Sequence, residues 1–380
     1  LGNFKHIKQY NPDLIIGVGG CVPQHEKENI RKKAPFVDIV FGSQNFNKIH
    51  EMIERFERKR DPIVSIIKQA DVYEDEMPVL RDGKFNAWIT IMNGCSRYCT
   101  FCIVPYVRGN EASRTPESII REVETAVQEG YKEITLLGQI IDLYGRDLKP
   151  RTSLDELLYK VSAVPGLERI RFLTSHPKYM SKAIVDAVAA LPNLCEYFHL
   201  PLQSGNDQIL SLMNRRNNMQ EYDDLINYVR EKVPQAVITT DFIVGFPGET
   251  EEQFLDTVNT CIKYEFDMAN TAAYSPRPGT PAATMENQIP DEEKSRRLQA
   301  LNRVINDIAK KKNKESIGRI ESVLVEGFKE KHNNYYGRTR GNKLVHFSGE
   351  GSLIGEIVDV RITDGTNASL RGDVLTAVTK

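Results

Sequence analysis

The middle of the chain alternates short apolar runs with helical patterns. Between residues 85 and 280 the apolar runs predict six strands, Ala87–Met92, Glu133–Leu137, Ile170–Thr174, Tyr197–Leu200, Val237–Val244 and Asn270–Tyr274. Helix-start signals stand between them, at Thr115-Pro116 and at the capping-box patterns Ser153–Glu156 and Thr250–Gln253. Alternating strands and helices form parallel sheets, so we expect an α/β fold, a partial barrel of six strand–helix units. Active residues should then lie at the carboxyl ends of the strands.

Different patterns flank this barrel. Before it, Leu14–Val18 and Phe36–Phe41 predict two strands of a smaller α/β unit, and the charged residues 57–84 predict a linker. After it, an apolar stripe predicts a helix from about Pro290 to Gly318. Short β segments then follow up to Ile362, which predicts a small β-barrel of about 60 residues, a size common in RNA-binding proteins. We therefore expect domains at 1–60, 81–312 and 315–380.

Composition and charge add one candidate surface. Hydrophobic residues make up 40% and charged residues 27% of the 380 residues, as in ordinary globular proteins. No apolar run approaches the ~20 residues of a membrane helix, so no membrane association is expected. The stretch from Lys294 to Arg319 contains nine Lys and Arg residues, and only Asp307 and Glu315 oppose their charge. This stretch either contacts phosphates or is a solvated helix face, and charge alone favours neither.

Three cysteines carry the main chemical signal. Cys95, Cys99 and Cys102 form a C-x3-C-x2-C triplet in a loop directly after the first barrel strand. A 4Fe–4S cluster normally takes four thiolates, so three leave one iron open to a substrate. S-adenosylmethionine can occupy that position through its amino and carboxylate groups, and an electron from the cluster then cleaves it. The alternative is a zinc site, which would need a fourth ligand that this loop lacks.

Three later loops fit a cofactor cleft at the strand ends. Gly138-Gln139 follows the second strand, a loop from Pro201 to Asp207 follows the fourth, and a loop from Gly245 to Thr250 follows the fifth. Their glycines permit close approach of the backbone to a ligand. The alternative is structural, with Asn206 or Asp207 as a helix cap and the glycines as turns.

The surroundings of these features resemble the radical S-adenosylmethionine methylthiotransferases. The resemblance rests on Asn93–Gly109 around the triplet and on five further motifs: Leu136–Gln139, Thr174–Pro177, His199–Gly205, Asp241–Thr250 and Tyr274–Thr280. Residues Tyr336–Phe347 resemble a TRAM domain, an RNA-binding β-barrel. Leu-Leu-Gly-Gln and Thr-Ser-His-Pro are most similar to the enzymes of this family that act on isopentenyladenosine in tRNA. The resemblance covers nearly the whole chain.

This resemblance implies a reaction and its participants. Such enzymes insert a methylthio group at carbon 2 of isopentenyladenosine beside the tRNA anticodon, with one S-adenosylmethionine as methyl donor and a second as radical source. The implied partners are the anticodon stem-loop and an electron donor such as flavodoxin or ferredoxin, and we expect a cytoplasmic monomer. The implied cofactor contacts are Phe101, Gln139, Gln203, Ser204, Asp241 and Gly245. The candidate RNA contacts are Lys310, Lys311, Lys312, Arg338 and Arg340.

The resemblance also gives Cys21 a role. Alone, Cys21 reads as a small core residue, but Gly20–Gln24 resembles the loop of one of three cysteines that hold a second, auxiliary 4Fe–4S cluster. The other two would lie before Leu1, so we expect this cluster only in a longer form of the protein. A further departure is Ile140-Ile141-Asp142, where the family usually has Asn-Val-Asn.

Other functions stay open at this point. A close alternative is a methylthiotransferase acting on threonylcarbamoyladenosine in tRNA or on a ribosomal-protein aspartate. An alternative of another class is a non-catalytic RNA-binding protein with a structural cluster, which would not cleave S-adenosylmethionine. We also expect the residues after Gly318 to be separable, so that their removal weakens tRNA binding but spares cofactor cleavage.

Overall fold

The chain forms two compact units. The computed structural model describes residues 1–67, 81, 83 and 85–375. The first unit contains the described residues up to 67 together with Met92–Tyr98 and Cys102–Ser113, and the second contains residues 81–91 where described, Cys99–Phe101 and the chain from Arg114 onward. Within the described residues, no helix is both long enough and apolar enough to cross a bilayer.

A parallel sheet of three strands organises the first unit. Its order is β1 (Gly17–Gly20), β2 (Ile39–Gly42) and β3 (Ile63–Ser65). Phe41, Met52 and Phe56 belong to one apolar cluster of this unit, and Ile16, Val37 and Val40 belong to another. The other elements are α1 (Gly2–Tyr10), α2 (Cys21–Glu26), α3 (Asn29–Lys33), η1 (Phe46–Lys48), α4 (Ile49–Lys59), β5 (Met92–Asn93), α5 (Val104–Arg108) and β6 (Ala112–Ser113).

The expected linker needs a correction at its beginning. Residues 57–84 were expected to connect domains, but α4 extends to Lys59 and β3 adds a strand at Ile63–Ser65. Ile63 is buried against the sheet, so its apolar side chain makes this segment part of the core in spite of its charged neighbours. Residues 68–80, 82 and 84 of the expected linker lie outside the described residues.

The second unit contains the predicted partial barrel. Its strands are β4 (Asn86–Thr90), β7 (Glu133–Leu137), β8 (Arg169–Phe172), β9 (Tyr197–His199), β10 (Val237–Val244) and β11 (Met268–Ala273). Strands β4-β7-β8 and β9-β10-β11 pair in parallel, and a parallel bridge from Ile170 to Leu194 joins the two sets. The six predicted strands and the α/β barrel class are thereby confirmed.

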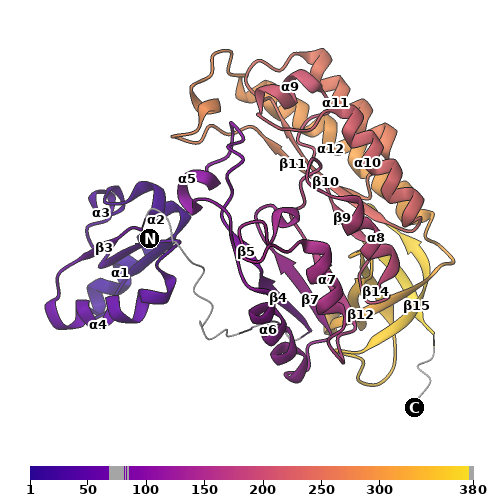
Figure 1. Cartoon of the computed structure of the whole chain (residues 1–380), viewed down its shortest axis with the longest axis horizontal. Coiled ribbons are helices and arrows are strands. Elements are labelled where there is room, and N and C mark those ends of the chain that lie inside the picture. The colour runs from indigo at the N-terminus through magenta and orange to yellow at the C-terminus, as the bar shows by residue number, and fades with distance from the viewer. Residues whose placement is uncertain (68–80, 82, 84, 376–380) are drawn as a thin grey trace. The chain divides into compact units, whose positions relative to one another are not determined.

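Helices cover the outer side of this arc (Figure 1). They are α6 (Pro116–Gln128), α7 (Leu154–Ser162), α8 (Lys182–Ala190), α9 (Asp207–Leu212), α10 (Met219–Lys232), α11 (Glu251–Tyr264) and α12 (Asp291–Lys314), with short turns η2 (Ile141–Leu143) and η3 (Pro281–Thr284). Tyr222 of α10 donates to the carbonyl oxygen of Leu200 at 3.1 Å, and Phe242 packs edge-on against Phe266. The helix-covered face of β10 therefore carries Phe242, and Thr239 and Asp241 point to the inner face.

All three predicted helix starts are confirmed, and two of them carry a side-chain cap. Thr115 accepts a hydrogen bond from the N–H of Ser118, and Thr250 forms a full capping box with Gln253. The helix α7 begins after Ser153 as predicted, but the capping box is absent, because the Ser153 side chain caps no backbone donor. Instead, the Thr152 hydroxyl donates to Glu156 at 2.6 Å, which occupies the carboxylate that a capping box would need.

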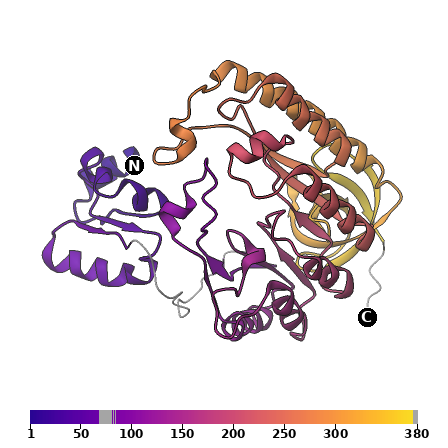
Figure 2. The same cartoon turned by 45° about the horizontal axis from the view of Figure 1, so that its top comes forward.

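A closed β-barrel ends the chain. Its strands are β12 (Ile320–Lys329), β13 (Asn334–Thr339), β14 (Leu344–Ser348), β15 (Ile357–Gly365) and β16 (Leu370–Val374), with η4 (Glu330–His332) between the first two. They close in the order β12-β13-β14-β16-β15 around a core that includes Val323, Phe347 and Val360. The yellow strands form a ring in Figure 2. The sequence pattern missed β16, because its short run carries Arg371 and Asp373 on the solvent side.

Candidate cluster and cofactor site

The segment that carries Cys95 is hydrogen-bonded to the antiparallel segment around Gly109 to Glu111. The N–H of Cys95 donates to the carbonyl oxygen of Gly109 at 2.9 Å. The N–H and hydroxyl of Ser96 both donate to Glu111 Oε1 at 3.0 Å, and Arg97 lies 3.4 Å from the same oxygen. Burial opposes ionisation of Glu111, but these hydrogen bonds and the Arg97 charge lower its pKa below the usual value. Glu111 therefore acts as an ionised brace behind the first cysteine.

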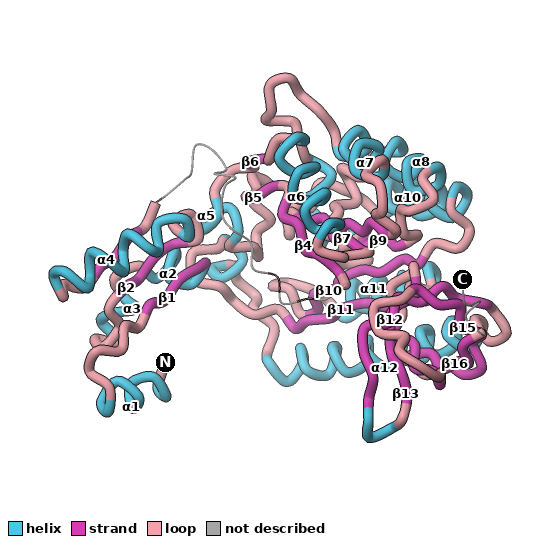
Figure 3. Tube along the Cα trace, turned by 90° about the horizontal axis from the view of Figure 1, so that it is seen from below, coloured by secondary structure: helices cyan, strands magenta, loops and turns pink. Residues whose placement is uncertain are grey.

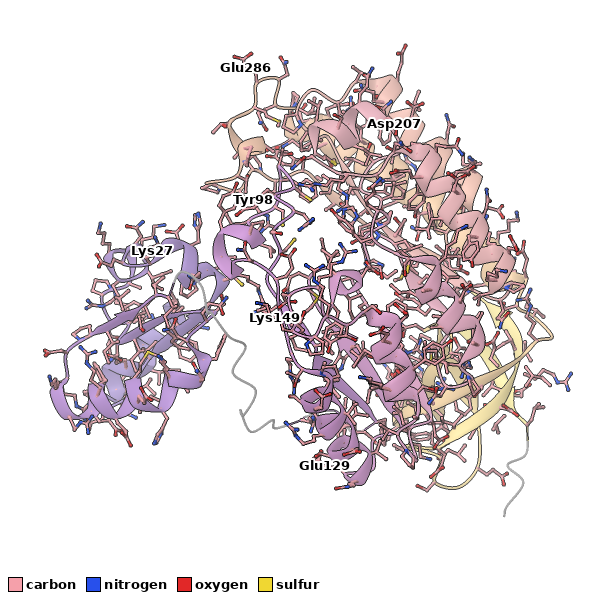
Figure 4. All side chains as sticks on the ribbon, viewed as in Figure 1. Lys27, Tyr98, Glu129, Lys149, Asp207 and Glu286 are labelled. Carbon is pink, nitrogen blue, oxygen red and sulfur yellow. The ribbon has the colours of Figure 1, made fainter. Side chains whose placement is uncertain are left out.

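Tyr98 turns the loop between the first two cysteines. It has a φ of 50°, in the left-handed region, and its ring contacts Tyr106 edge-on at 5.6 Å. Figure 4 labels Tyr98 in this loop. After Cys102 the chain enters α5, and the carbonyl oxygen of Val107 accepts a hydrogen bond from the Ser43 hydroxyl at 2.9 Å. The loop is thus tied to the first unit on both sides of Tyr98.

The middle cysteine is anchored at the carboxyl ends of barrel strands. Thr100, its neighbour, donates its N–H to the carbonyl oxygen of Met213 at 3.0 Å and accepts from the N–H of Ala282 at 2.9 Å. Phe101 packs in an apolar cluster with Met213, Phe246 and Tyr274. Phe246 and Tyr274 follow β10 and β11, so Cys99 and Phe101 lie at the end of the barrel where active residues were expected.

The donor set fits an iron–sulfur cluster. Cys95 and Cys99 are buried, Cys102 is half-buried, and none of the three forms a disulfide. Across residues 1–67, 81, 83 and 85–375, no three His, Cys, Asp or Glu side chains are arranged to hold a single metal ion. A cubane spreads its ligands, because each thiolate binds a different iron. Three thiols from one braced loop therefore suit a 4Fe–4S cluster with one open iron.

Gly94 gives a direct test of this loop. It has a φ of +81°, and a side-chain carbon there would lie 1.9 Å from the carbonyl oxygen of Asn110. We expect Gly94→Ala to displace Cys95 and to lower the iron content of the reconstituted protein severely. Gly130→Ala is the matched control, because Gly130 has a φ of +93° but no atom within 4 Å of the added carbon. Equal iron contents in both variants would contradict this role for Gly94.

The loops after β7 and β8 are tied to each other. The Thr174 hydroxyl donates to the carbonyl oxygen of Gly138 at 2.6 Å, and the N–H of His176 donates to Asp142 Oδ2 at 2.6 Å. Burial raises the pKa of Asp142 to about 7, although the hydrogen bonds and the Arg146 charge oppose this. Gln139 Oε1 is buried and has no hydrogen-bond partner among the described residues. It is therefore available to a ligand at this strand end.

The loops after β9 and β10 are also joined. Gln203, with a φ of 80°, donates its N–H to the carbonyl oxygen of Asp241 at 2.8 Å and accepts from the N–H of Ile243 at 2.9 Å. Asn270 donates to Asp241 Oδ1 at 3.0 Å, and His199 Nε2 lies 3.4 Å from Asp241 Oδ2. Partial burial works against ionisation, but these neighbours hold the pKa of Asp241 below its usual value. Asp241 is thus an anionic group on the inner face.

Ser204 and Asn206 have structural surroundings. Ser204 is fully buried, and its hydroxyl accepts the N–H of Asn206 at 3.3 Å. The side chain packs toward Thr257 of α11, and its predicted cofactor contact stays a prediction. Asn206 accepts from the N–H groups of Gln208 and Ile209, as a helix cap does, and Asp207 begins α9 (Figure 4). The structural alternative for these cap residues is therefore confirmed.

The Gly245 turn depends on two basic residues that sequence reasoning placed on a surface. Gly245 has a φ of +70°, and its N–H donates to Glu249 Oε2 at 2.7 Å. Arg297 pairs with the same oxygen at 2.8 Å, and the Lys294 side chain comes within 2.3 Å of where a Gly245 Cβ would stand. Both basic residues are buried, at 5% and 6% exposure. The sequence signal for their burial was their spacing, because Lys294 and Arg297 lie at i and i+3 on the same side of α12 as the apolar Leu301 and Ile305.

The candidate RNA contacts fall into two groups. Lys310 is exposed, and the Arg338 side chain is 42% exposed with Glu326 at 3.4 Å. Lys311 is also exposed but pairs with Glu265 at 2.5 Å. Lys312 and Arg340 pair with Asp267 and Glu196, each at 2.8 Å, and their predicted RNA contacts stay predictions. Their charges are already matched by buried or half-buried carboxylates.

Comparison with family models agrees with this architecture. Residues 89–261 match the radical SAM superfamily, and residues 314–375 match the TRAM domain. Among solved structures, a radical S-adenosylmethionine methyltransferase, TsrM of Kitasatospora setae, aligns with a TM-score of 0.55 at 14% identity and covers 71% of this chain and 57% of its own. At that identity the likeness shows the barrel fold alone.

Curated relatives extend the match over nearly the whole chain. A tRNA-2-methylthio-N(6)-dimethylallyladenosine synthase of Clostridium botulinum is 45% identical over 98% of this chain and 84% of its own length. Enzymes of the same name from Pelotomaculum thermopropionicum and Thermoanaerobacter pseudethanolicus are each 44% identical and cover 98% and 100% of this chain and 84% and 81% of their own lengths. With its cysteine triplet at the carboxyl ends of a radical SAM barrel and its TRAM domain, the chain belongs to the radical SAM methylthiotransferase family, among the tRNA-2-methylthio-N(6)-dimethylallyladenosine synthases.

Proposed function

We propose that this protein adds a methylthio group to carbon 2 of isopentenyladenosine next to the tRNA anticodon. The single observation that carries this proposal is the 45% identity over nearly the full chain to synthases of that name. The braced cysteine loop and the TRAM barrel supply the two parts that such an enzyme needs, a radical site and an RNA-binding surface. The same identity favours isopentenyladenosine over threonylcarbamoyladenosine or a ribosomal-protein aspartate.

Cys95, Cys99 and Cys102 would hold the catalytic cluster. With S-adenosylmethionine on its open iron, the cluster supplies a radical able to remove an unreactive hydrogen. Phe101 would provide an apolar wall at the cluster, and Gln139 Oε1 would accept a hydrogen bond from the cofactor. The anionic Asp241, presented beside Gln203, would accept from hydroxyl or amino groups of a nucleoside. Gly245 would contact the cofactor through its backbone, because the Lys294 side chain lies where a Gly245 side chain would stand.

Cys21 would belong to the auxiliary cluster. It begins α2 directly after β1, and α2 packs beside α5, the helix that follows Cys102. Both helices belong to the first unit. Cys21 is half-buried and outside any disulfide, which leaves its thiol available as a ligand. In this proposal a second S-adenosylmethionine donates the methyl group, and the second cluster carries the sulfur.

The remaining partners follow from the chemistry. Reductive cleavage needs a low-potential one-electron donor, so we propose a flavodoxin or ferredoxin. Because tRNA is the substrate and thiolates are the ligands, we place the enzyme in the cytoplasm, where thiols stay reduced. The single chain contains both a radical barrel and an RNA-binding barrel, and we propose that it works as a monomer.

The exposed Lys310 and the half-buried Arg338 are the best candidates for binding phosphates. We expect Lys310→Glu or Arg338→Glu to weaken tRNA binding and to lower the slope of log affinity against log salt by roughly 0.7–0.9 for each phosphate that is no longer neutralised. Lys312→Gln is the contrasting variant, because Lys312 pairs with Asp267. We expect it to reduce stability and to leave the salt slope unchanged. A salt titration measures both, and an unchanged slope in the first two variants would remove them from the RNA surface.

Isotope transfer tests the proposed substrate directly. Anaerobically reconstituted protein is given S-adenosylmethionine, reductant and tRNA that carries deuterium at carbon 2 of isopentenyladenosine. We expect mass spectrometry to find one deuterium in the deoxyadenosine product. tRNA with threonylcarbamoyladenosine, deuterated at carbon 2, is the matched control. Transfer from the control alone would replace the proposed substrate, and no cleavage of S-adenosylmethionine would favour a non-catalytic RNA-binding protein.

A further inference from the structure

Two arginines line the inner face of the barrel near the start of β8. Arg169 and Arg171 are 1% and 3% exposed. In the sheet Arg169 pairs in register with Glu133 of β7, and Arg171 Nε donates to Glu133 Oε1 at 2.8 Å. Buried charges are costly unless they are paired and hydrogen-bonded. One carboxylate cannot satisfy two guanidinium groups, so the remaining donors must find acceptors elsewhere.

Those acceptors come from the C-terminal barrel. Arg169 donates to the carbonyl oxygens of Ser322 and Arg338 at 2.8 and 3.0 Å, and to the Ser322 hydroxyl at 2.9 Å. Arg171 donates to the carbonyl oxygens of Thr339 and Arg340 at 2.6 and 2.5 Å. Apart from the Ser322 hydroxyl, these acceptors are backbone oxygens of Ser322 in β12, of Arg338 and Thr339 in β13, and of Arg340 just after β13. The two arginines therefore bind mainly the backbone of the paired strands β12 and β13 rather than their side chains.

The turn from 340 to 343 continues the contact along the barrel. Arg340 pairs with Glu196, just before β9, at 2.8 Å. Lys343 pairs with Asp267, just before β11, at 3.0 Å. A side-chain carbon at Gly341 would lie 2.3 Å from Val237 Cγ2, at the first residue of β10. Strands β12 and β13 and the turn from 340 to 343 thus lie against the amino-terminal ends of β7 to β11. Figures 1 and 3 show β12 beside these strands.

The cofactor residues follow the opposite ends of the same strands. Gln139 follows β7, Gln203 follows β9, and Asp241 lies in the second half of β10. We propose that the TRAM barrel, besides contacting RNA, closes the amino-terminal end of the radical SAM barrel. Arg169 and Arg171 are then positioning residues, which act on the cofactor loops through the register of the strands. This inference rests on the cofactor site proposed above.

A consequence is that the TRAM barrel is needed even when no RNA is present. The chain pattern alone led to the opposite expectation, that residues after Gly318 can be removed without loss of cofactor cleavage. Removal would leave Arg169, Arg171 and Glu133 facing water at an open barrel end. Small displacements of aligned groups can reduce rates by about 100-fold, so cleavage of S-adenosylmethionine without tRNA should fall.

Gly341 allows this to be tested without touching the arginines. Its φ is not in the left-handed region, so a substitution there strains only the contact with Val237. In the 380-residue chain with reconstituted cluster, we expect Gly341→Val to lower deoxyadenosine formation without tRNA by roughly 10-fold to 100-fold. Gly341→Ala should have a smaller effect. Combining Val237→Ala with Gly341→Ala should restore activity, because the nearest remaining carbon of residue 237 lies 3.2 Å away.

Further readouts separate this role from general instability. Iron content should stay at the wild-type value, and amide hydrogen exchange should rise in β8. Lys331→Val is the matched control in the exposed turn between β12 and β13, and it should leave cleavage unchanged. Wild-type cleavage in Gly341→Val, with weaker tRNA binding as its only defect, would overturn the proposal. Absence of cleavage in the wild type would instead overturn the cofactor site.

Discussion

Replacing Cys99 with alanine should abolish both the cluster and the cleavage of S-adenosylmethionine. Cys99 is buried, and its neighbours Thr100 and Phe101 are fixed by backbone hydrogen bonds and by an apolar cluster at the strand ends. The loop therefore cannot rearrange to offer another ligand. With two thiolates left, a cubane loses one of its three protein ligands and is open to dissociation. Iron analysis, the broad absorption in the blue region and deoxyadenosine assays measure the loss.

Cys261→Ala is the matched control for this experiment. Cys261 is 1% exposed on α11, and burial raises the pKa of its thiol to about 12. It is therefore a protonated core residue, and its replacement should cost stability but keep iron and activity. If Cys99→Ala retained cleavage, the cluster assignment would fail. If Cys261→Ala lost iron as well, the effect of Cys99→Ala would reflect general unfolding.

Replacing Asp142 with asparagine should remove a large pH dependence of stability. The folded-state pKa of Asp142 is raised from 3.8 to about 7, chiefly by burial. The protonated form is thus the one that the fold favours. Its contribution is fully present below about pH 4 and is lost as the pH rises through about 7. A shift of this size corresponds to about 4 kcal/mol in the free energy of unfolding.

Asparagine keeps the useful contact without the titration. Its side-chain oxygen can still accept the N–H of His176, and its amide can lie against the buried hydroxyl of Ser175 beside it. We expect the variant to match the wild type near pH 4 and to exceed its stability at pH 8. Denaturant unfolding across this range measures the difference between the two proteins. A difference that stays constant with pH would show that Asp142 is ionised throughout.

The cysteine triplet and most strands could be predicted from local patterns in the sequence. Thiolate spacing is local, so Cys95, Cys99 and Cys102 could be recognised from eight residues. Strand positions could be predicted because buried parallel strands are continuous apolar runs, and Thr250–Gln253 could be recognised because a capping box spans only one turn. The strands β3 and β16 were not predicted, because both are short. In addition, β3 follows a charged segment, and β16 itself contains Arg371 and Asp373.

The surroundings of the charged residues became visible in the folded chain. In the sequence, Lys312 and Arg340 are indistinguishable from solvated basic residues, whereas Lys294 and Arg297 differ from them only by their position on the apolar side of α12. Each is matched by a partner brought close by folding, and Arg340 and Glu196 are 144 positions apart. Arg169 and Arg171 alternate with apolar residues in β8, which in the sequence is typical of a strand with one solvated face. Both are buried instead, because backbone oxygens of the C-terminal barrel accept their hydrogen bonds. A local sequence pattern cannot reveal ion pairs or hydrogen bonds between residues that are far apart in the chain. A buried charge needs such a partner, and only folding brings the two together.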